Sequence, residues 1–161
     1  MFNFLWNNLW GQMLMTLLIS MVPIIELRGA IPIAVGAGLP FYIAIPIAVI
    51  GNLLPVPFII MFIKRIFAWI RRQLPKLNSM VDKLEARAQG KSETVQKSAF
   101  WGLFIFVAIP LPGTGAWTGA LIAAMLDMRV KKALPAIVAG VLTAGAIVTI
   151  VTALGVDIFV K

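Results

Sequence analysis

Glu26 and Arg28 are the residues of this chain whose types and spacing best suit chemistry. They are the only charged side chains among the first 63 residues, and mostly apolar sequence surrounds them. A charge inside a bilayer costs at least ~2.5–3.5 kcal/mol even on the most lenient insertion scale. Pro23, Gly29 and Pro32 flank the pair and favour a break in a helix there. If this segment lies at membrane depth, it is the default functional site.

The two charges suggest different roles. Arg28 offers a planar guanidinium that can donate two parallel hydrogen bonds, which suits a phosphate or a carboxylate. Burial favours the neutral form of Glu26, whereas the nearby Arg28 favours its ionised form. A carboxyl balanced in this way can take up and release a proton and so couple transport to a gradient. The structural alternative is that Glu26 only neutralises Arg28 and stabilises the turn.

The composition is that of an integral membrane protein. The 161 residues are 61% hydrophobic and their mean hydropathy is +0.99, far above the values of soluble domains. The chain has no cysteine and no histidine, which excludes disulfides and removes the usual zinc and haem ligands. We therefore expect no cofactor and no metal. The sequence also lacks a nucleophile–base pair within its apolar segments, so we expect no enzyme activity.

Basic residues indicate the topology. Twelve of the 14 Lys and Arg residues fall in two clusters, at 64–97 and 129–132. Lys/Arg-rich loops of this length remain cytoplasmic, so both clusters should face the same side. The loop from Lys76 to Lys97 lacks the aromatic residues of a nucleic-acid site, so we expect lipid headgroups and not nucleic acid as partners. The central segment has helical spacing of apolar residues and favours an amphipathic helix on the inner leaflet, or one that packs on a second copy in a homodimer.

The second half of the chain contains a broken apolar stretch. Residues 98–127 are too many for one straight span and too few for two. The sequence IPLPGTG at 109–115 interrupts them. With both ends cytoplasmic, the stretch predicts a re-entrant hairpin with arms at Phe100–Ile109 and Ala116–Leu126. Two short spans joined by a tight turn are the alternative.

The first half shows the same arrangement. Leu9–Val22 and Ile33–Leu39 are predicted as short arms around a break at Pro23–Pro32, and a full helix is predicted at Phe41–Phe62. The matching full helix of the second half is predicted at Ala133–Leu154. The chain is thus expected to form one membrane domain with three parts: repeat 1 at 1–63, a basic linker at 64–97 and repeat 2 at 98–161.

The repeat rests on a few matched positions. An offset of 87 residues places Pro23 on Pro110, and a slip of two residues then places Gly51 on Gly140. The charge map gives the halves opposite orientations, so the first hairpin enters from outside and the second from inside. We therefore predict an all-α integral membrane protein with two inverted repeats, each a re-entrant hairpin followed by a transmembrane helix. Inverted repeats with broken helices at matched positions mark the binding sites of many transporters.

Candidate site residues lie at these breaks. The second half-helix of each hairpin begins with free backbone N–H groups, which favour an anion. Packing between helices is the alternative role for Asn52 and Trp117. The predicted proton-coupling residue is Glu26, and the predicted substrate-binding residues are Arg28, Gly29, Gly113, Thr114, Gly115, Trp117 and Asn52.

The motifs PIIELRGAIPIAVGAG and VAIPLPGTGAWTGA resemble those of the small multidrug export protein family. That family is similar in architecture to the DedA superfamily, whose members carry two opposed re-entrant hairpins and are implicated in moving lipid carriers such as undecaprenyl phosphate. The resemblance implies a multi-pass translocase of the prokaryotic inner membrane, with Glu26 and Arg28 matching the charged motif of the first hairpin. DedA-type second hairpins carry arginines, whereas the second break here has none.

The sequence therefore predicts a transporter or flippase. Its expected substrate is an amphipathic anion such as a polyprenyl-phosphate-like lipid, and its expected coupling partner is the proton. One alternative is a multidrug exporter of lipophilic cations, with Glu26 as the exchange carboxylate. The other is a structural or assembly protein of the membrane that transports nothing.

Overall fold

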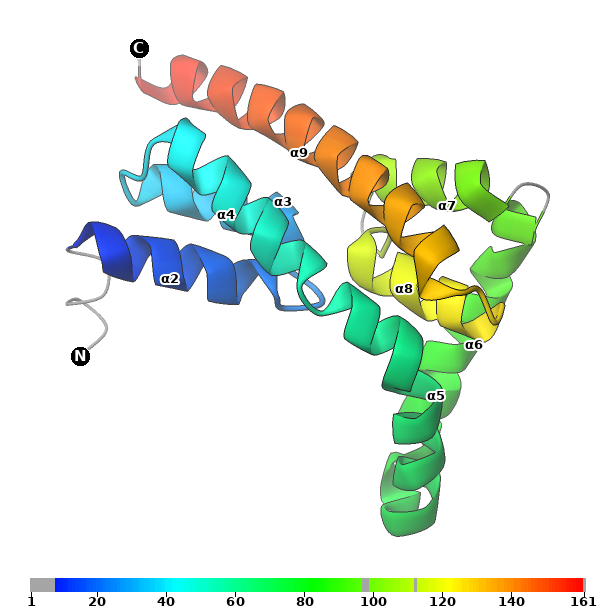
Figure 1. Ribbon diagram of the computed structural model, residues 1–161. Coiled ribbons are helices and arrows are strands. Elements are labelled where there is room, and N and C mark those ends of the chain that lie inside the picture. Colours follow the sequence, from blue (N-terminus) through cyan, green and yellow to red (C-terminus); the bar gives the residue numbers. More distant parts are fainter. Residues whose placement is uncertain (1–7, 97–98, 112, 161) are drawn as a thin grey trace.

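The structure is a computed structural model that describes residues 8–96, 99–111 and 113–160, and the side chains of 8–87, 100–111 and 113–155. All elements in these ranges are helices, arranged as in Figure 1. In chain order they are α2 (Leu9–Ser20), α3 (Glu26–Gly36), α4 (Phe41–Leu53), α5 (Val56–Gln73), the short 3₁₀ helix η1 (Pro75–Leu77), α6 (Asn78–Gln96), α7 (Ala99–Ala108), α8 (Ala116–Met125) and α9 (Val130–Val160).

Four short helices form two pairs. Residues 21–25 join α2 to α3, and residues 109–115 join α7 to α8. The two helices of each pair contact one another. The second pair follows the sequence closely, because α7 and α8 begin and end within one residue of the predicted arms.

The first break is shorter than predicted. We expected a break over Pro23–Pro32 and a second arm at Ile33–Leu39, but α3 already begins at Glu26 and contains Pro32. A proline inside a helix removes one backbone hydrogen bond, here the bond to the carbonyl of Arg28, and the helix continues through it. Glu26 itself has a φ of +50°, a region that few residues other than glycine adopt. The chain therefore turns sharply at the charged residue.

The predicted helix at Phe41–Phe62 is wrong in one respect, because the structure divides it. α4 ends before residue 54 and α5 begins after residue 55. Pro55 and Pro57 have no N–H groups to donate to the carbonyls of Gly51 and Leu53, four residues earlier in each case. The helical direction then resumes, and α5 extends past the predicted end to Gln73.

Two segments are long and apolar enough to cross a membrane. One is Phe41–Gln73, which contains α4 and α5, and the other is Val130–Gly155 within α9. α9 begins three residues before the predicted Ala133–Leu154 helix and extends beyond it. Leu9–Ser20 and Ala116–Met125 are shorter apolar helices. Together with the composition, these segments favour a membrane protein.

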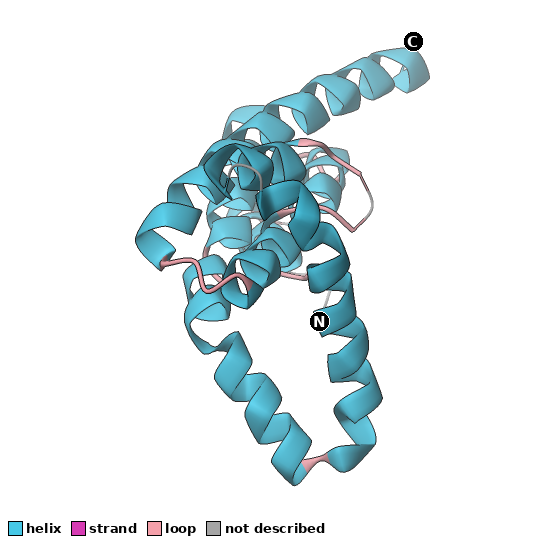
Figure 2. Cartoon of the chain, turned by 90° about the vertical axis from the view of Figure 1, so that its right-hand side faces the viewer, coloured by secondary structure: helices cyan, strands magenta, loops and turns pink. Residues whose placement is uncertain are grey.

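The predicted amphipathic linker forms an arm. Figures 1 and 2 show the C-terminal part of α5 and the N-terminal part of α6 projecting from the other helices. Arg71 on α5 joins the two sides through Asp82 at 2.7 Å and Glu85 at 2.8 Å on α6. Lys97 of the predicted linker and Pro112 of the predicted second break lie outside the described residues.

Glycines allow the closest helix contacts. A Cβ at Gly140 of α9 would lie 2.7 Å from the Cβ of Val107 on α7. A Cβ at Gly51 of α4 would lie 2.0 Å from Ser20 Oγ and 2.6 Å from the Leu17 carbonyl oxygen on α2. Small residues let helix backbones approach in membranes, where the hydrophobic effect does not drive helix association. α2 with α4 and α7 with α9 are thus held together by the same kind of contact.

We predict that Gly51→Ala lowers the unfolding midpoint in detergent, because the added methyl overlaps backbone of α2 and costs about 1–3 kcal/mol. Gly36→Ala is the matched control, since a Cβ at Gly36 meets no atom within 4 Å. A Gly51→Ala protein as stable as the Gly36→Ala protein would contradict this close contact.

Candidate functional site

The two breaks contact each other through Glu26. Its side chain is only 3% exposed, and Oε1 accepts a hydrogen bond of 3.2 Å from the backbone N–H of Trp117. Trp117 is the second residue of α8, whose first N–H groups have no partners within the helix. A carboxylate is stabilised at this position by those N–H groups and by the helix dipole. Glu26 at the start of α3 therefore caps α8.

Gly115 makes room for this carboxylate. A Cβ at Gly115 would lie 2.1 Å from Oε2 of Glu26, and the φ of +129° at Gly115 is strained for any residue with a Cβ. Glycine is consequently the residue that satisfies both the backbone turn and the approach of Glu26.

Arg28 bonds the other side of the second break. Its Nη1 donates to the carbonyl of Leu111, and its Nη2 donates to the carbonyl of Ile109 at 3.2 Å and to Thr114 Oγ1 at 3.1 Å. Ile109 directly follows α7 and Leu111 lies two residues further, so both carbonyls lie beside the helix end where the dipole is negative. A guanidinium suits this place because several donors diverge from one fixed plane.

Thr114 and Trp117 complete the contact. Thr114 Oγ1 lies 2.7 Å from the carbonyl oxygen of Ile109 and 2.8 Å from that of Leu111, to which its hydroxyl can donate. The indole Nε1 of Trp117 donates to the carbonyl of Met21 at 3.0 Å. Met21 directly follows α2, so the second break also provides a donor for the first.

Glu26 and Arg28 thus bond the opposite break and not each other. Within the described part of the chain no ion pair joins them. Glu26 carries its negative charge to the positive end of α8, and Arg28 carries its positive charge to the negative end of α7. The pair therefore matches both helix ends that the second break creates.

The structure brings five of the predicted site residues together: Glu26, Arg28, Thr114, Gly115 and Trp117. The groups that we expected to be open to an anion are largely engaged within the protein. The Trp117 N–H bonds Glu26, and both terminal nitrogens of Arg28 bond the second break. Nε of Arg28 is buried and has no partner among the described residues.

The other predicted site residues are Gly29, Gly113 and Asn52. Gly29 is in the first turn of α3, where a Cβ would lie 2.4 Å from Cγ2 of Ile25. Gly113 has a φ of +78° and serves the turn of the second break. Asn52 is on α4, 1% exposed. The described residues contain no cluster of acidic side chains that could hold a metal.

Sequence reasoning missed several partners. The carbonyls of Met21, Ile109 and Leu111 belong to the site, but backbone groups leave no signal in side-chain types. Only the breaks indicated that some carbonyls would need donors. The ion pair of Lys64 with Asp127 at 2.7 Å, which joins α5 to the turn after α8, was also missed.

We predict that Thr114→Val lowers the unfolding midpoint, because it removes a hydroxyl bonded to Arg28 and to the end of α7, at a cost of about 1–2 kcal/mol. Thr114→Ser keeps the hydroxyl and is expected to lose much less. Thermal unfolding of both variants in the same detergent checks this, and equal losses would show that the hydroxyl does not stabilise the break.

Comparison with known proteins agrees with the motifs at these two breaks. Residues 26–147 match the family described as "Putative small multi-drug export protein", a match that begins at Glu26, directly after the first break, and includes the second break. No curated protein and no solved structure matches the chain. The architectural similarity to the DedA superfamily stays a prediction. Since the match covers most of the chain, this protein belongs to the small multidrug export protein family.

Proposed function

We propose that this protein is a membrane exporter of small lipophilic cations, driven by a proton gradient, in which Glu26 carries the coupled proton. The family description supports the export of small drug-like molecules. The observation that carries the proposal is the buried carboxylate of Glu26, which bonds the start of α8 across the two breaks. An intramembrane carboxylate of this kind is a functional group by default.

Protonation of Glu26 would weaken this contact. The ionised carboxylate accepts from the Trp117 N–H and matches the positive end of α8. A neutral carboxyl loses the charge that stabilises it there, so uptake of a proton favours separation of the breaks. A cation entering beside the ionised carboxylate would compete with the α8 end for the same charge. Proton and cation are thus alternative partners of one group, which is the requirement for exchange.

Arg28 opposes cation export less than the sequence suggested. The fixed positive charge of Arg28 would by itself repel a cation, and its donors suit an anion. In the structure the guanidinium bonds the carbonyls that follow α7, so part of its charge is balanced by that helix end. Glu26 is then the carboxylate left to attract a cation.

A polyprenyl-phosphate-like lipid is the second candidate substrate. The observation in its favour is the buried Nε of Arg28, a charged donor without a partner among the described residues. A phosphate oxygen would satisfy this donor. The two terminal nitrogens would also have to leave the α7 end for a bidentate bond to form, so the cation remains the first choice.

We further propose that the two helix pairs are re-entrant hairpins of inverted repeats. In this repeat α2 corresponds to α7, α3 to α8, and α4 with α5 to α9. The contact of α2 with α4 then matches that of α7 with α9, and the contact of α3 with α9 matches that of α8 with α5. The matched Gly51 and Gly140 both permit a close approach to the first helix of their own half. Helices of 10–12 residues rise only about 15–18 Å, roughly half of the hydrocarbon thickness. Breaks that meet from opposite faces would then lie inside the membrane.

Cysteine labelling tests this orientation, because the chain contains no cysteine of its own. We expect an impermeant thiol reagent to modify Gly36→Cys from the outer face and Asp127→Cys from the cytoplasmic face. A side chain at Gly36 meets no atom within 4 Å, and Asp127 is exposed, so its replacement removes only the surface ion pair with Lys64. Modification of both from one face would refute the inverted arrangement.

Transport in proteoliposomes tests the role of Glu26. We expect a pH gradient to drive rhodamine 123, a lipophilic cation, across the membrane, and Glu26→Gln to slow this at least about tenfold because an amide cannot carry the coupled proton. Glu85→Gln on the α6 arm is the matched control and should transport at the wild-type rate.

Three outcomes would contradict the proposal. If folded Glu26→Gln protein transports normally, Glu26 does not couple the proton. If only a fluorescent polyprenyl phosphate moves, and Arg28→Ala stops it, the lipid is the substrate. If neither compound moves and Glu26→Gln only lowers stability, the contact serves structure alone.

A further inference from the structure

Asn52 is a buried polar group that the contact between the breaks does not use. Its side chain is 1% exposed, and among the described residues neither Nδ2 nor Oδ1 has a hydrogen-bond partner. An amide buried without partners costs several kcal/mol in an apolar medium, about 2–7 depending on the reference. Packing between helices does not explain it, because an asparagine that joins helices does so by a hydrogen bond to a neighbour.

The backbone beside Asn52 is also short of donors. Pro55 and Pro57 remove the helical N–H groups that would bond the carbonyls of Gly51 and Leu53, the two residues that flank Asn52. Irregular backbone at membrane depth is tolerated where it is buried in protein or lines a water-filled cavity. An unpartnered amide and an interrupted helix thus coincide at one place.

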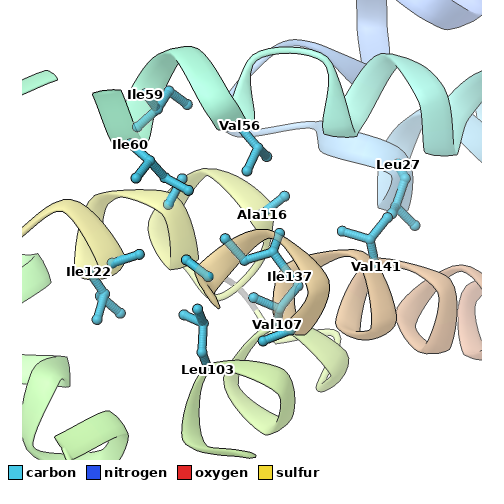
Figure 3. Packing of buried hydrophobic residues seen from close by; sticks show 14 of the residues in the cluster. Leu27, Val56, Ile59, Ile60, Leu103, Val107, Ala116, Ile122, Ile137 and Val141 are labelled. Atoms are coloured by element: carbon cyan, nitrogen blue, oxygen red, sulfur yellow. The ribbon is translucent and has the colours of Figure 1, made fainter. Parts of the chain in front are cut away.

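This place lies level with the contact between the breaks. α4 runs back alongside α3 after the turn at residues 37–40, and the two helices contact each other. A helix rises 1.5 Å per residue, so Glu26 lies about 15 Å from that turn along α3 and Asn52 lies about 16 Å from it along α4. The two residues are therefore at about the same height. One turn beyond Asn52, Val56 packs in the same buried cluster as Ala116, the residue before Trp117 (Figure 3).

We propose that Asn52 is the centre of a buried binding site for a group that both donates and accepts a hydrogen bond. Nδ2 can donate and Oδ1 can accept, so the ligand is a water molecule or a polar group, such as an amine, of the transported compound. Water here would connect the interior to Glu26 and give its proton a route. A ligand group from the transported compound presupposes the proposed function, whereas a bound water molecule does not.

Thiol accessibility tests whether the site is wet. Cysteine is close to asparagine in size, and Val56→Cys is the matched control, since Val56 is fully buried only four residues later. We expect a small methanethiosulfonate reagent to modify Asn52→Cys at least about tenfold faster than Val56→Cys, because only a hydrated thiol ionises and reacts. Equal, slow modification of both would overturn the site.

A second measurement uses the unmodified protein and does not depend on how the variants fold. Hydroxyl radicals produced by radiolysis of buried water should oxidise Val56 more, relative to its intrinsic reactivity, than Leu39, which is similarly buried but lies in a separate cluster at the turn between α3 and α4. Equal protection of the two side chains would mean that no water resides near Asn52, and would count against the proposal.

Ligand protection separates the two sources. If rhodamine 123 slows the modification of Asn52→Cys, the transported compound occupies the site; if it does not, water is the ligand. Failure of wild-type transport would refute the proposed function, but the accessibility and oxidation results would still decide the Asn52 site. The two proposals can therefore fail separately.

Discussion

Backbone polar groups at the two helix breaks are the constraint on which this structure depends. A helix that ends inside an apolar molecule leaves N–H groups at its start and carbonyls at its end without partners, and lipid provides none. Here each break supplies partners to the other. Glu26 accepts from the start of α8, Arg28 donates to the carbonyls after α7, and Trp117 donates to the carbonyl after α2. The contact between the breaks is therefore made of hydrogen bonds that the breaks themselves require, beside a hydrophobic cluster in which Leu27 and Val56 of the first half pack with Ala116 and Ile137 of the second.

This constraint also connects the fold with the proposed transport. Arg28 cannot lose its charge under any ordinary condition, so its bonds to the α7 end do not depend on pH. Glu26 can be neutralised, and only its half of the contact is then weakened. When Glu26 is neutralised, its bond to α8 weakens while the bonds of Arg28 remain. The contact can therefore loosen while Arg28 still holds the two breaks in the same relative position. Such a contact suits a transporter better than a purely structural ion pair, in which both charges would bond each other.

Much of this arrangement could be predicted from the residues, and the rest could not for identifiable reasons. Apolar length, proline and glycine indicated both breaks and the arms of the second pair, because helix propensity and bilayer thickness act locally. The start of α3 at Glu26 was missed, since Glu26 has a positive φ that its residue type does not favour. The break at Pro55 carried a visible signal, two prolines spaced by one residue, that the continuous apolar run concealed. Apart from the Thr114 hydroxyl, the partners of Glu26 and Arg28 are backbone groups more than 80 residues away, which no pattern of side chains reveals.

The absence of charge from the second break follows from the same physics. Its two helix ends already present a positive and a negative pole, so the break acts as a receptor for a pair of opposite charges spaced as Glu26 and Arg28 are. A lysine or arginine placed there would repel Arg28, and an aspartate or glutamate would compete with Glu26 for the α8 end. Asn52 is compatible with this balance because an amide is polar without being charged, and it can bind a neutral group near Glu26 while leaving the charges of the contact unchanged. The single carboxylate at the contact is then the one group through which a proton or a cation can alter it.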